Sequence, residues 1–211
     1  MNRKNASKNQ LLRMPTYLYH LRMLDESGEK FVTAPQLARA LDLNVELVKK
    51  DLALVSTSEG TPRVGREVGQ LIKDIISFLE YDQTTEAILV GCGSLGKALA
   101  SYEGWSEFGL KIVAIFDNDI SIIGQKVNGL TVLPLERIKE VQEIYSAPIG
   151  IITVPKEAAQ ITAERLVKAG CKALWNFAHV HLMVPRRIVV QDESMASSLA
   201  ILNHRLKELD S

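Results

Sequence analysis

Six residues in the middle of the chain have the spacing of a loop that binds a nucleotide diphosphate. The Gly-x-Gly-x-x-Gly motif consists of Gly91, Cys92, Gly93, Ser94, Leu95 and Gly96. In such a loop the first glycine permits a tight turn, the second lets backbone amides approach the diphosphate, and the third lets a helix pack closely on a strand. Asp117 follows the last glycine by 21 residues. An acid at that distance accepts hydrogen bonds from ribose hydroxyls and repels the 2′-phosphate of NADP(H), so the motif predicts an NAD(H) site. A glycine-rich turn that binds no nucleotide is the alternative.

The segments around this loop predict an α/β fold with a doubly wound parallel sheet, in which ligands bind at the carboxyl ends of the strands. Short apolar runs alternate with helical segments at residues 87–90, 111–116, 130–133, 149–154 and 171–177. Thr153, Val154 and Pro155 lie at the end of one run, and Phe177 ends another. We expect these four residues to line the crevice for the nicotinamide, although ordinary loop or core positions would also explain them.

Two short helices in the front part of the chain form a second candidate site. Thr33 begins a capping box for the first helix, and Asn44 caps the second, which covers residues 45–55. Two helices joined by a tight turn have the layout of a helix-turn-helix, whose second helix enters the major groove of DNA. The outer side of this helix carries the candidate DNA-binding residues Asn44, Glu46, Lys49 and Lys50. Lysines there neutralise phosphates, and exposed lysines on an ordinary helix pair are the alternative.

The charge distribution supports a DNA-binding front half. Residues 1–73 carry 12 basic and 8 acidic side chains, and residues 74–211 carry 13 and 17, so a chain without net charge joins a basic half to an acidic half. The first 24 residues contain no acid and hold Arg3, Lys4, Lys8, Arg13 and Arg22. Residues 56–69 are rich in Ser, Thr, Gly and Pro and contain Arg63 and Arg66. This segment predicts either the hairpin of a winged helix, which contacts DNA, or a linker between domains.

Other classes of protein are excluded. Cys92 and Cys171 are far apart and have no metal-ligand spacing, so we expect no disulfide, no metal and a cytoplasmic location. No uncharged apolar run approaches the roughly 20 residues of a membrane span. The 115 residues after Gly96 are taken up by the sheet and its helices, and no histidine has an identifiable catalytic partner. We therefore predict that the chain is not an enzyme, with a small NAD-dependent oxidoreductase as the alternative.

Longer stretches of the sequence carry a family resemblance. They are RMPTYLYHLRML, VTAPQLARALDL, VKKDL, LVGCGSLGKALASY, IVAIFDND, IITVPKEAAQ, LVKAGCKALWNFA and SLAILNHRL. With these stretches the chain resembles the Rex family of bacterial redox-sensing transcriptional repressors along nearly its whole length. The resemblance implies a homodimer that binds an inverted-repeat operator in double-stranded DNA when NADH is low. Rising NADH releases the DNA, and NAD+ competes without causing release.

The resemblance also implies a domain plan and the roles of single residues. The expected domains are a winged helix at residues 1–80, a Rossmann domain at 81–192 and a last helix at 193–211 that is swapped onto the partner subunit. By position, Lys49 and Lys50 match basic residues of the DNA-reading helix. The residues that match the cofactor site are Gly91, Gly93, Gly96, Tyr102, Asp117, Pro155 and Phe177.

This sequence departs from the Rex pattern at three places, one of which is His179 in place of the proline that commonly follows Asn-Phe-Ala. The wing usually reads Phe-Gly-x-Phe-Gly-x-Arg-Gly-x-Gly-Tyr, and this chain has Val55, Ser56, Ser58, Glu59 and Arg66 across that stretch. Ser194 stands where an aspartate often begins the last helix and pairs with an arginine of the first helix, for which Arg13 is the candidate. We expect either a changed operator or a weakened response. An NAD-binding dimeric regulator without DNA binding is a further alternative.

Overall fold

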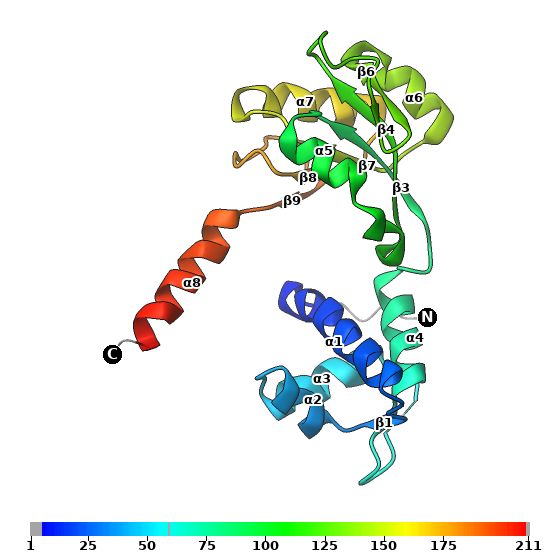
Figure 1. Cartoon of the computed structure of the whole chain (residues 1–211), viewed down its shortest axis with the longest axis vertical. Coiled ribbons are helices and arrows are strands. Elements are labelled where there is room, and N and C mark those ends of the chain that lie inside the picture. Colours follow the sequence, from blue (N-terminus) through cyan, green and yellow to red (C-terminus); the bar gives the residue numbers. More distant parts are fainter. Residues whose placement is uncertain (1–5, 59, 210–211) are drawn as a thin grey trace. The chain divides into compact units, whose positions relative to one another are not determined.

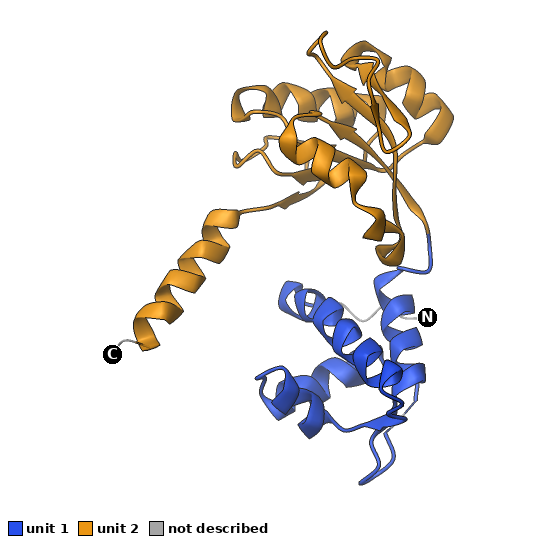
Figure 2. Ribbon diagram, viewed as in Figure 1, with its two compact units in different colours: residues 1–83 blue, residues 84–211 orange. Residues whose placement is uncertain are grey.

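The computed structural model describes residues 6–58 and 60–209. Arg3, Lys4 and Glu59 lie outside the described residues. The chain divides into two compact units, Met1–Gln83 and Thr84–Ser211 (Figure 2). Among the described residues, no helix has the length and apolar character that a bilayer crossing requires.

The first unit is a small helical domain with one pair of short strands (Figure 1). Its elements are α1 (Lys8–Glu26), β1 (Phe31–Val32), α2 (Ala34–Ala40), α3 (Val45–Val55), β2 (Arg66–Glu67) and α4 (Val68–Leu79). Met14, Tyr17, Leu18 and Leu21 are spaced by three or four residues along α1, so they form one buried face. That face packs with buried residues of the other three helices, and the cluster forms the core of this unit.

Local capping explains where the helices of the helix-turn-helix begin. The Thr33 side chain accepts a hydrogen bond from the Gln36 backbone, and the Gln36 side chain accepts one in return, which confirms the predicted capping box. The Oδ1 atom of Asn44 accepts hydrogen bonds from the N–H groups of Glu46 and Leu47. These bonds satisfy donors that the first turn of α3 would leave unpaired, so α3 starts where the sequence predicts.

The segment between α3 and α4 is a hairpin. It ends in β2, which pairs antiparallel with β1 from the segment before α2, with Phe31 opposite Glu67 and Val32 opposite Arg66. Thr61 and Gly65 form a further antiparallel bridge near the tip. Gly65 has a φ of +100°, and a Cβ atom there would lie 2.3 Å from the Val32 carbonyl oxygen, so the hairpin needs glycine at this point. The segment therefore has the folded form predicted for a wing and is not an extended linker. Its contact with DNA stays a prediction, and β1 was not predicted.

The second unit is an α/β domain built on a seven-stranded sheet. Its elements are β3 (Thr85–Val90), α5 (Ser94–Ser101), β4 (Leu110–Asp117), β5 (Lys126–Val127), β6 (Leu130–Pro134), α6 (Ile138–Tyr145), β7 (Ile149–Ile152), α7 (Lys156–Ala169), β8 (Ala173–Asn176), β9 (Val189–Asp192) and α8 (Met195–Leu209), with short 3-10 helices at Glu103–Phe108 and Leu135–Arg137. The strand order is β5-β6-β4-β3-β7-β8-β9, and all neighbours are parallel except β5 and β6.

This strand order confirms the predicted doubly wound sheet. Without β5, the order is the 3-2-1-4-5-6 arrangement of the Rossmann fold, which binds ligands where the order reverses, next to the first strand. Apolar side chains alternate between the two faces of the central strands. Helices α6 and α7 cover one face and α5 lies on the other (Figure 1). The sequence predicted neither β5 nor β9.

Helix α8 confirms the predicted last helix. None of its described residues is buried. Its apolar positions Met195, Leu199, Leu202 and Leu206 are 54–68% exposed. Exchange of this helix between subunits stays a prediction.

Candidate functional site

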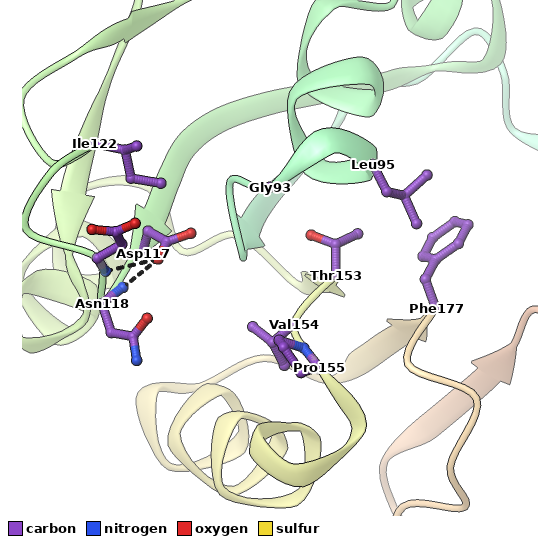
Figure 3. A pocket seen from close by; sticks show the side chains of 10 residues that line it. Gly93, Leu95, Asp117, Asn118, Ile122, Thr153, Val154, Pro155 and Phe177 are labelled. Carbon is purple, nitrogen blue, oxygen red and sulfur yellow. Dashed lines mark hydrogen bonds between the residues drawn. The ribbon is translucent and has the colours of Figure 1, made fainter.

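A pocket of about 510 Å³ opens at the carboxyl ends of β3, β4, β7 and β8 (Figure 3). It is lined by Gly93, Leu95, Asp117, Asn118, Asp119, Ile122, Thr153, Val154, Pro155 and Phe177. The pocket lies beside β3, where the strand order reverses, which is the ligand site of open α/β sheets. Its size is that of a small-molecule site.

The three glycines of the loop have different surroundings. Gly91 has a φ of +101°, and a Cβ atom there would lie 2.7 Å from the Thr153 backbone. A Cβ atom on Gly96 would lie 1.8 Å from the carbonyl oxygen of Gly91, so α5 can approach β3 only with glycine at this position. Gly93 has no atom within 4 Å of its Cβ position. Close backbone contacts therefore explain why Gly91 and Gly96 are glycines. Gly93 has no such contact, and the space beside its Cα atom is open.

That open space fits a diphosphate. Gly93 is the N-cap of α5, and no side chain caps the first turn of this helix. The N–H groups of an uncapped first turn attract anions because they are unpaired and lie at the positive end of the helix dipole. Gly93 lines the pocket, so a side chain at this position would take up pocket space beside the helix start. The loop of this chain therefore has the cradle that a nucleotide diphosphate requires.

The Asp117 carboxylate has a structural part in the site. It is buried, and its Oδ2 atom accepts a hydrogen bond of 2.5 Å from the N–H of Cys92. Its Oδ1 atom accepts hydrogen bonds from the N–H groups of Asn118, at 2.7 Å, and Asp119, at 2.9 Å. A carboxylate has about four acceptor positions, so about one remains for a ribose hydroxyl. Asp117 thus ties the glycine loop to the end of β4 while it lines the pocket.

The two ends of the pocket differ in chemistry (Figure 3). One end holds Asp117, Asn118 and Asp119, and hydrogen bonds from Ser121 lower the pKa of Asp119 below its ordinary value. At the other end the side chains of Leu95 and Phe177 point toward each other. This gradient from carboxylates to apolar groups suits an elongated ligand with a sugar at one end and a flat ring at the other.

The structure brings many of the predicted cofactor residues to this pocket. Gly93, Leu95, Asp117, Thr153, Val154, Pro155 and Phe177 line it. Gly91, Cys92 and Gly96 are buried in the loop, Ser94 is exposed at the start of α5, and Tyr102 is half-exposed and outside the lining. Sequence reasoning did not assign Asn118, Asp119 or Ile122 to the site. The two polar residues follow directly after the predicted ribose acid, and Ile122 has no signal in the motif.

The candidate DNA-binding residues of the first unit have unequal surroundings. The Nζ atom of Lys49 lies 2.7 Å from Oε1 of Glu46, so this lysine shares its charge with a neighbouring acid. Lys50 is exposed beside them. Asn44 uses its Oδ1 atom as the cap of α3.

The two arginines of the hairpin also differ in their surroundings: one side chain is exposed and the other is hydrogen-bonded within the unit. Arg63 is exposed at the tip, with a φ of +66°. Arg66 points back into the unit, because its Nε donates a 2.9 Å hydrogen bond to Oγ of Ser56. Arg63 is therefore available to a partner molecule, and Arg66 braces the hairpin on the end of α3.

Comparisons with known proteins decide the family. Residues 82–180 match the family model described as “CoA binding domain”, and residues 6–53 match the one described as “Putative DNA-binding protein N-terminus”. The redox-sensing transcriptional repressor Rex of Bacteroides thetaiotaomicron is 39% identical over 196 residues, which cover 93% of this chain and 89% of that protein. The chain belongs to the Rex family.

A solved Rex structure agrees over nearly the whole chain. The Rex-family repressor RSP, in complex with β-NAD+ and operator DNA, superposes with a TM-score of 0.89 and 29% identity, covering 98% of this chain and 95% of RSP. RSP in complex with β-NADH gives a TM-score of 0.88 at 28% identity, covering 98% of this chain and 97% of RSP. The Rex relatives are named as transcriptional repressors, as the prediction of a non-enzyme requires.

The structure gives Arg13, the candidate for the Rex switch, a partner within its own unit. Its Nε and Nη2 atoms donate to the two oxygens of Asp51 at 2.6 and 3.0 Å. Tyr17 donates to the same carboxylate at 2.8 Å, and Gln10 at 3.2 Å. Ser194, the other half of the predicted switch, accepts a hydrogen bond from the N–H of Ser197 at the start of α8. A pairing between Arg13 and the last helix stays a prediction.

This buried pair joins α1 to α3, the candidate DNA-reading helix. The Asp51 side chain is fully buried, and that of Arg13 is 20% exposed. Burial alone would raise the pKa of Asp51, but the hydrogen bonds from Arg13, Tyr17 and Gln10 outweigh burial and lower it. Burial and the neighbouring Asp51 carboxylate raise the pKa of Tyr17 to about 12. Asp51 follows Lys50 directly in the sequence, so the pair fixes the part of α3 that carries the lysines.

Proposed function

We propose that this chain is a redox-sensing transcriptional repressor. The pocket of the second unit binds NAD(H), and the helix-turn-helix of the first unit binds double-stranded operator DNA. Binding of NADH lowers the affinity for DNA, which requires that NADH and DNA favour different arrangements of the molecule. The observation that carries the proposal is the open space over Gly93, beside an uncapped helix start, in a chain of the Rex family. Such a repressor works in the cytoplasm, where the bacterial operator DNA lies.

The lining of the pocket supports NADH as the signal. Asp117 and Asp119 place two carboxylates at the polar end, and no Lys or Arg is among the described lining residues, so the extra phosphate of NADPH is disfavoured. The apolar end offers no charged group to the ring. The cationic nicotinamide of NAD+ loses more hydration free energy there than the neutral ring of NADH.

The exposed cations of the first unit support operator binding. Lys49, Lys50 and Arg63 lie on the outer side of α3 and at the hairpin tip, and these parts of a winged helix contact phosphates and groove edges. Asp51 and Arg66 act from inside the unit and hold these parts in place.

A homodimer is part of the proposal. The apolar side chains of α8 are exposed along its length, although burial of apolar surface stabilises a helix of this kind. A second copy of the chain would cover them, and a two-fold dimer matches an inverted-repeat operator.

The test is DNA binding measured with and without the nucleotides. A labelled inverted-repeat duplex, selected from a random pool with the wild-type chain, is titrated with protein at fixed salt and followed by fluorescence anisotropy. NADH and NAD+ are then added in separate titrations. We expect NADH to release the DNA and NAD+ to leave it bound.

The other outcomes assign other functions. NADH binding without any DNA affinity would favour an NAD-binding dimeric regulator. Consumption of NADH with a carbonyl substrate would contradict the assignment as a repressor. A Lys50→Ala variant with unchanged DNA affinity would remove α3 from the interface.

A further inference from the structure

Aromatic side chains connect the pocket to the segment that precedes α8. Phe177 lines the pocket, and its ring centroid lies 5.1 Å from that of Trp175. Trp175 lies 5.5 Å from Trp105, and Trp105 lies 5.0 Å from Tyr102, both in edge-on contacts. Such separations are those of rings in direct contact. The four rings therefore form a continuous row that starts at the apolar end of the pocket.

Trp175 also holds the chain just before α8. Its indole Nε1–H donates a 2.8 Å hydrogen bond to Oε1 of Glu193. The backbone N–H of Glu193 donates to the carbonyl of Asn176, and the Asn176 side chain donates to Asp192 at 2.7 Å. The end of β8 thus binds Asp192, the last residue of β9, and Glu193, which follows it. The Trp175 bond is the one made by a side chain in contact with the pocket lining.

The segment around Glu193 sets how α8 begins. Glu193 is partly buried, whereas no described residue of α8, which starts two residues later at Met195, is buried. Side-chain packing within the chain therefore does not fix the direction of α8. The hydrogen bonds at residues 192 and 193 are the fixed points from which the helix departs.

We propose that Trp175 is a positioning residue that links occupation of the pocket to the direction of α8. This inference rests on the proposed function. A nicotinamide ring placed against Phe177 presses on a side chain whose other neighbour is Trp175. The ring of Trp105 contacts Trp175, whereas its Nε1–H donates a 2.7 Å hydrogen bond to the Leu99 carbonyl and not to Glu193. A displacement of Phe177 therefore moves Trp175, whose ring it contacts, and with it the hydrogen bond between Trp175 and Glu193.

The test compares variants that keep the rings but change their hydrogen bonds. Trp175→Phe keeps an aromatic ring beside Phe177 and removes the donor to Glu193. Glu193→Ala removes the acceptor, and Glu193→Gln retains an oxygen that can accept. Trp105→Phe is the matched control, because it removes the same indole N–H from a bond that does not involve Glu193. For each full-length variant, NADH affinity is measured by calorimetry and operator affinity by anisotropy, with and without NADH.

We expect Trp175→Phe and Glu193→Ala to reduce the ratio of operator affinities without and with NADH at least five-fold. Affinity for NADH itself changes less than two-fold in each variant. A chain that combines Trp175→Phe with Glu193→Ala shows no further reduction of the ratio, because both changes break the same hydrogen bond. Glu193→Gln and Trp105→Phe keep the wild-type ratio. Hydrogen exchange at residues 189–199 changes on NADH binding in the wild type and not in Trp175→Phe.

Three results overturn the inference. A wild-type ratio in Trp175→Phe shows that the bond carries no coupling. An equal loss in Trp105→Phe shows that ring packing, and not the bond to Glu193, is responsible. If the wild-type chain binds NADH and releases DNA without any change in exchange at residues 189–199, the inference fails and the proposed function stands. A wild-type chain that does not bind NADH overturns both.

Discussion

Each unit places a buried carboxylate next to its candidate site, and the two carboxylates are held by different chemistry. Asp51 on α3 accepts hydrogen bonds from the side chains of Arg13, Tyr17 and Gln10. Asp117 beside the glycine loop accepts three hydrogen bonds, all from backbone N–H groups. Backbone donors are present whatever the side chain, whereas side-chain donors are lost by a single substitution. The position of α3, the candidate DNA-reading helix, therefore depends on a few side chains, and the position of the glycine loop depends on backbone geometry.

Substitution of the loop glycines should have the largest effect, because it changes backbone geometry directly. We expect Gly96→Ala to destabilise the second unit by at least about 4 kcal/mol, since its Cβ atom would lie 1.8 Å from a carbonyl oxygen that cannot move independently. Gly93→Ala is the matched variant. It meets no atom, so stability stays within about 1 kcal/mol of the wild type while NADH affinity falls at least about ten-fold.

Urea denaturation and calorimetry with NADH separate these two effects. An unchanged NADH affinity in Gly93→Ala would contradict the placement of the diphosphate over this residue. A Gly96→Ala chain of wild-type stability would show that the loop adapts to a side chain. It would contradict the conclusion that the glycine loop depends on backbone geometry.

Loss of a side-chain donor should have the next largest effect. We expect Arg13→Met to lower the free energy of unfolding by about 3 kcal/mol, because it leaves the Asp51 carboxylate buried with its charge unpaired. Lys73→Met, at an exposed position of α4, is the control and should leave stability unchanged. Denaturation curves for both variants provide the measurement, and similar values for the two would remove the special role of the buried pair.

The ion pair between Arg13 and Asp51 also makes the free energy of unfolding depend on pH. Because folding lowers the pKa of Asp51, the folded chain keeps the carboxylate ionised where the unfolded chain, with an ordinary pKa of 3.8, already protonates it. The stabilisation is complete above that ordinary value and is lost as the pH falls through the lowered pKa. We expect the difference in unfolding free energy between the wild type and Asp51→Asn to be constant from about pH 7 to about pH 5 and to shrink below about pH 4. A difference that stays constant in acid would contradict this account.

The smallest expected effect comes from the exposed ion pair between Glu46 and Lys49 on α3. We expect Glu46→Gln to leave stability unchanged and to raise operator affinity a few-fold, because Lys49 no longer shares its charge with an acid 2.7 Å away. The dependence of affinity on salt should steepen by about one phosphate contact. Anisotropy at several salt concentrations gives both quantities. An unchanged slope would place Lys49 away from the phosphates.

Sequence reasoning succeeded where the physical cause is local. The caps at Thr33 and Asn44 bond to residues two or three positions away, so their meaning can be read from neighbouring letters. The glycine loop is similar, because three glycines and a following acid restrict one turn between a strand and a helix. The strand order then follows from the alternation of strands and helices.

Features that depend on distant residues were not predictable. Arg13 and Asp51 are 38 positions apart, and nothing in the sequence indicated that they pair. Strands β5 and β9 are two and four residues long, and β9 is largely exposed, so neither has a distinct apolar run. Ile122 joins the pocket only because the turn after β4 brings it there.

The row of aromatic rings also gives the chain an intrinsic fluorescence signal. The sequence contains two tryptophans, Trp105 and Trp175, and both belong to the second unit. Tryptophan emission therefore follows the unfolding of Thr84–Ser211 alone, while circular dichroism follows the helices of both units. Separate midpoints in the two signals would reveal that the units unfold independently. Because tryptophan emission overlaps the absorption of NADH but not that of NAD+, the same two residues distinguish the reduced from the oxidised nucleotide without any label.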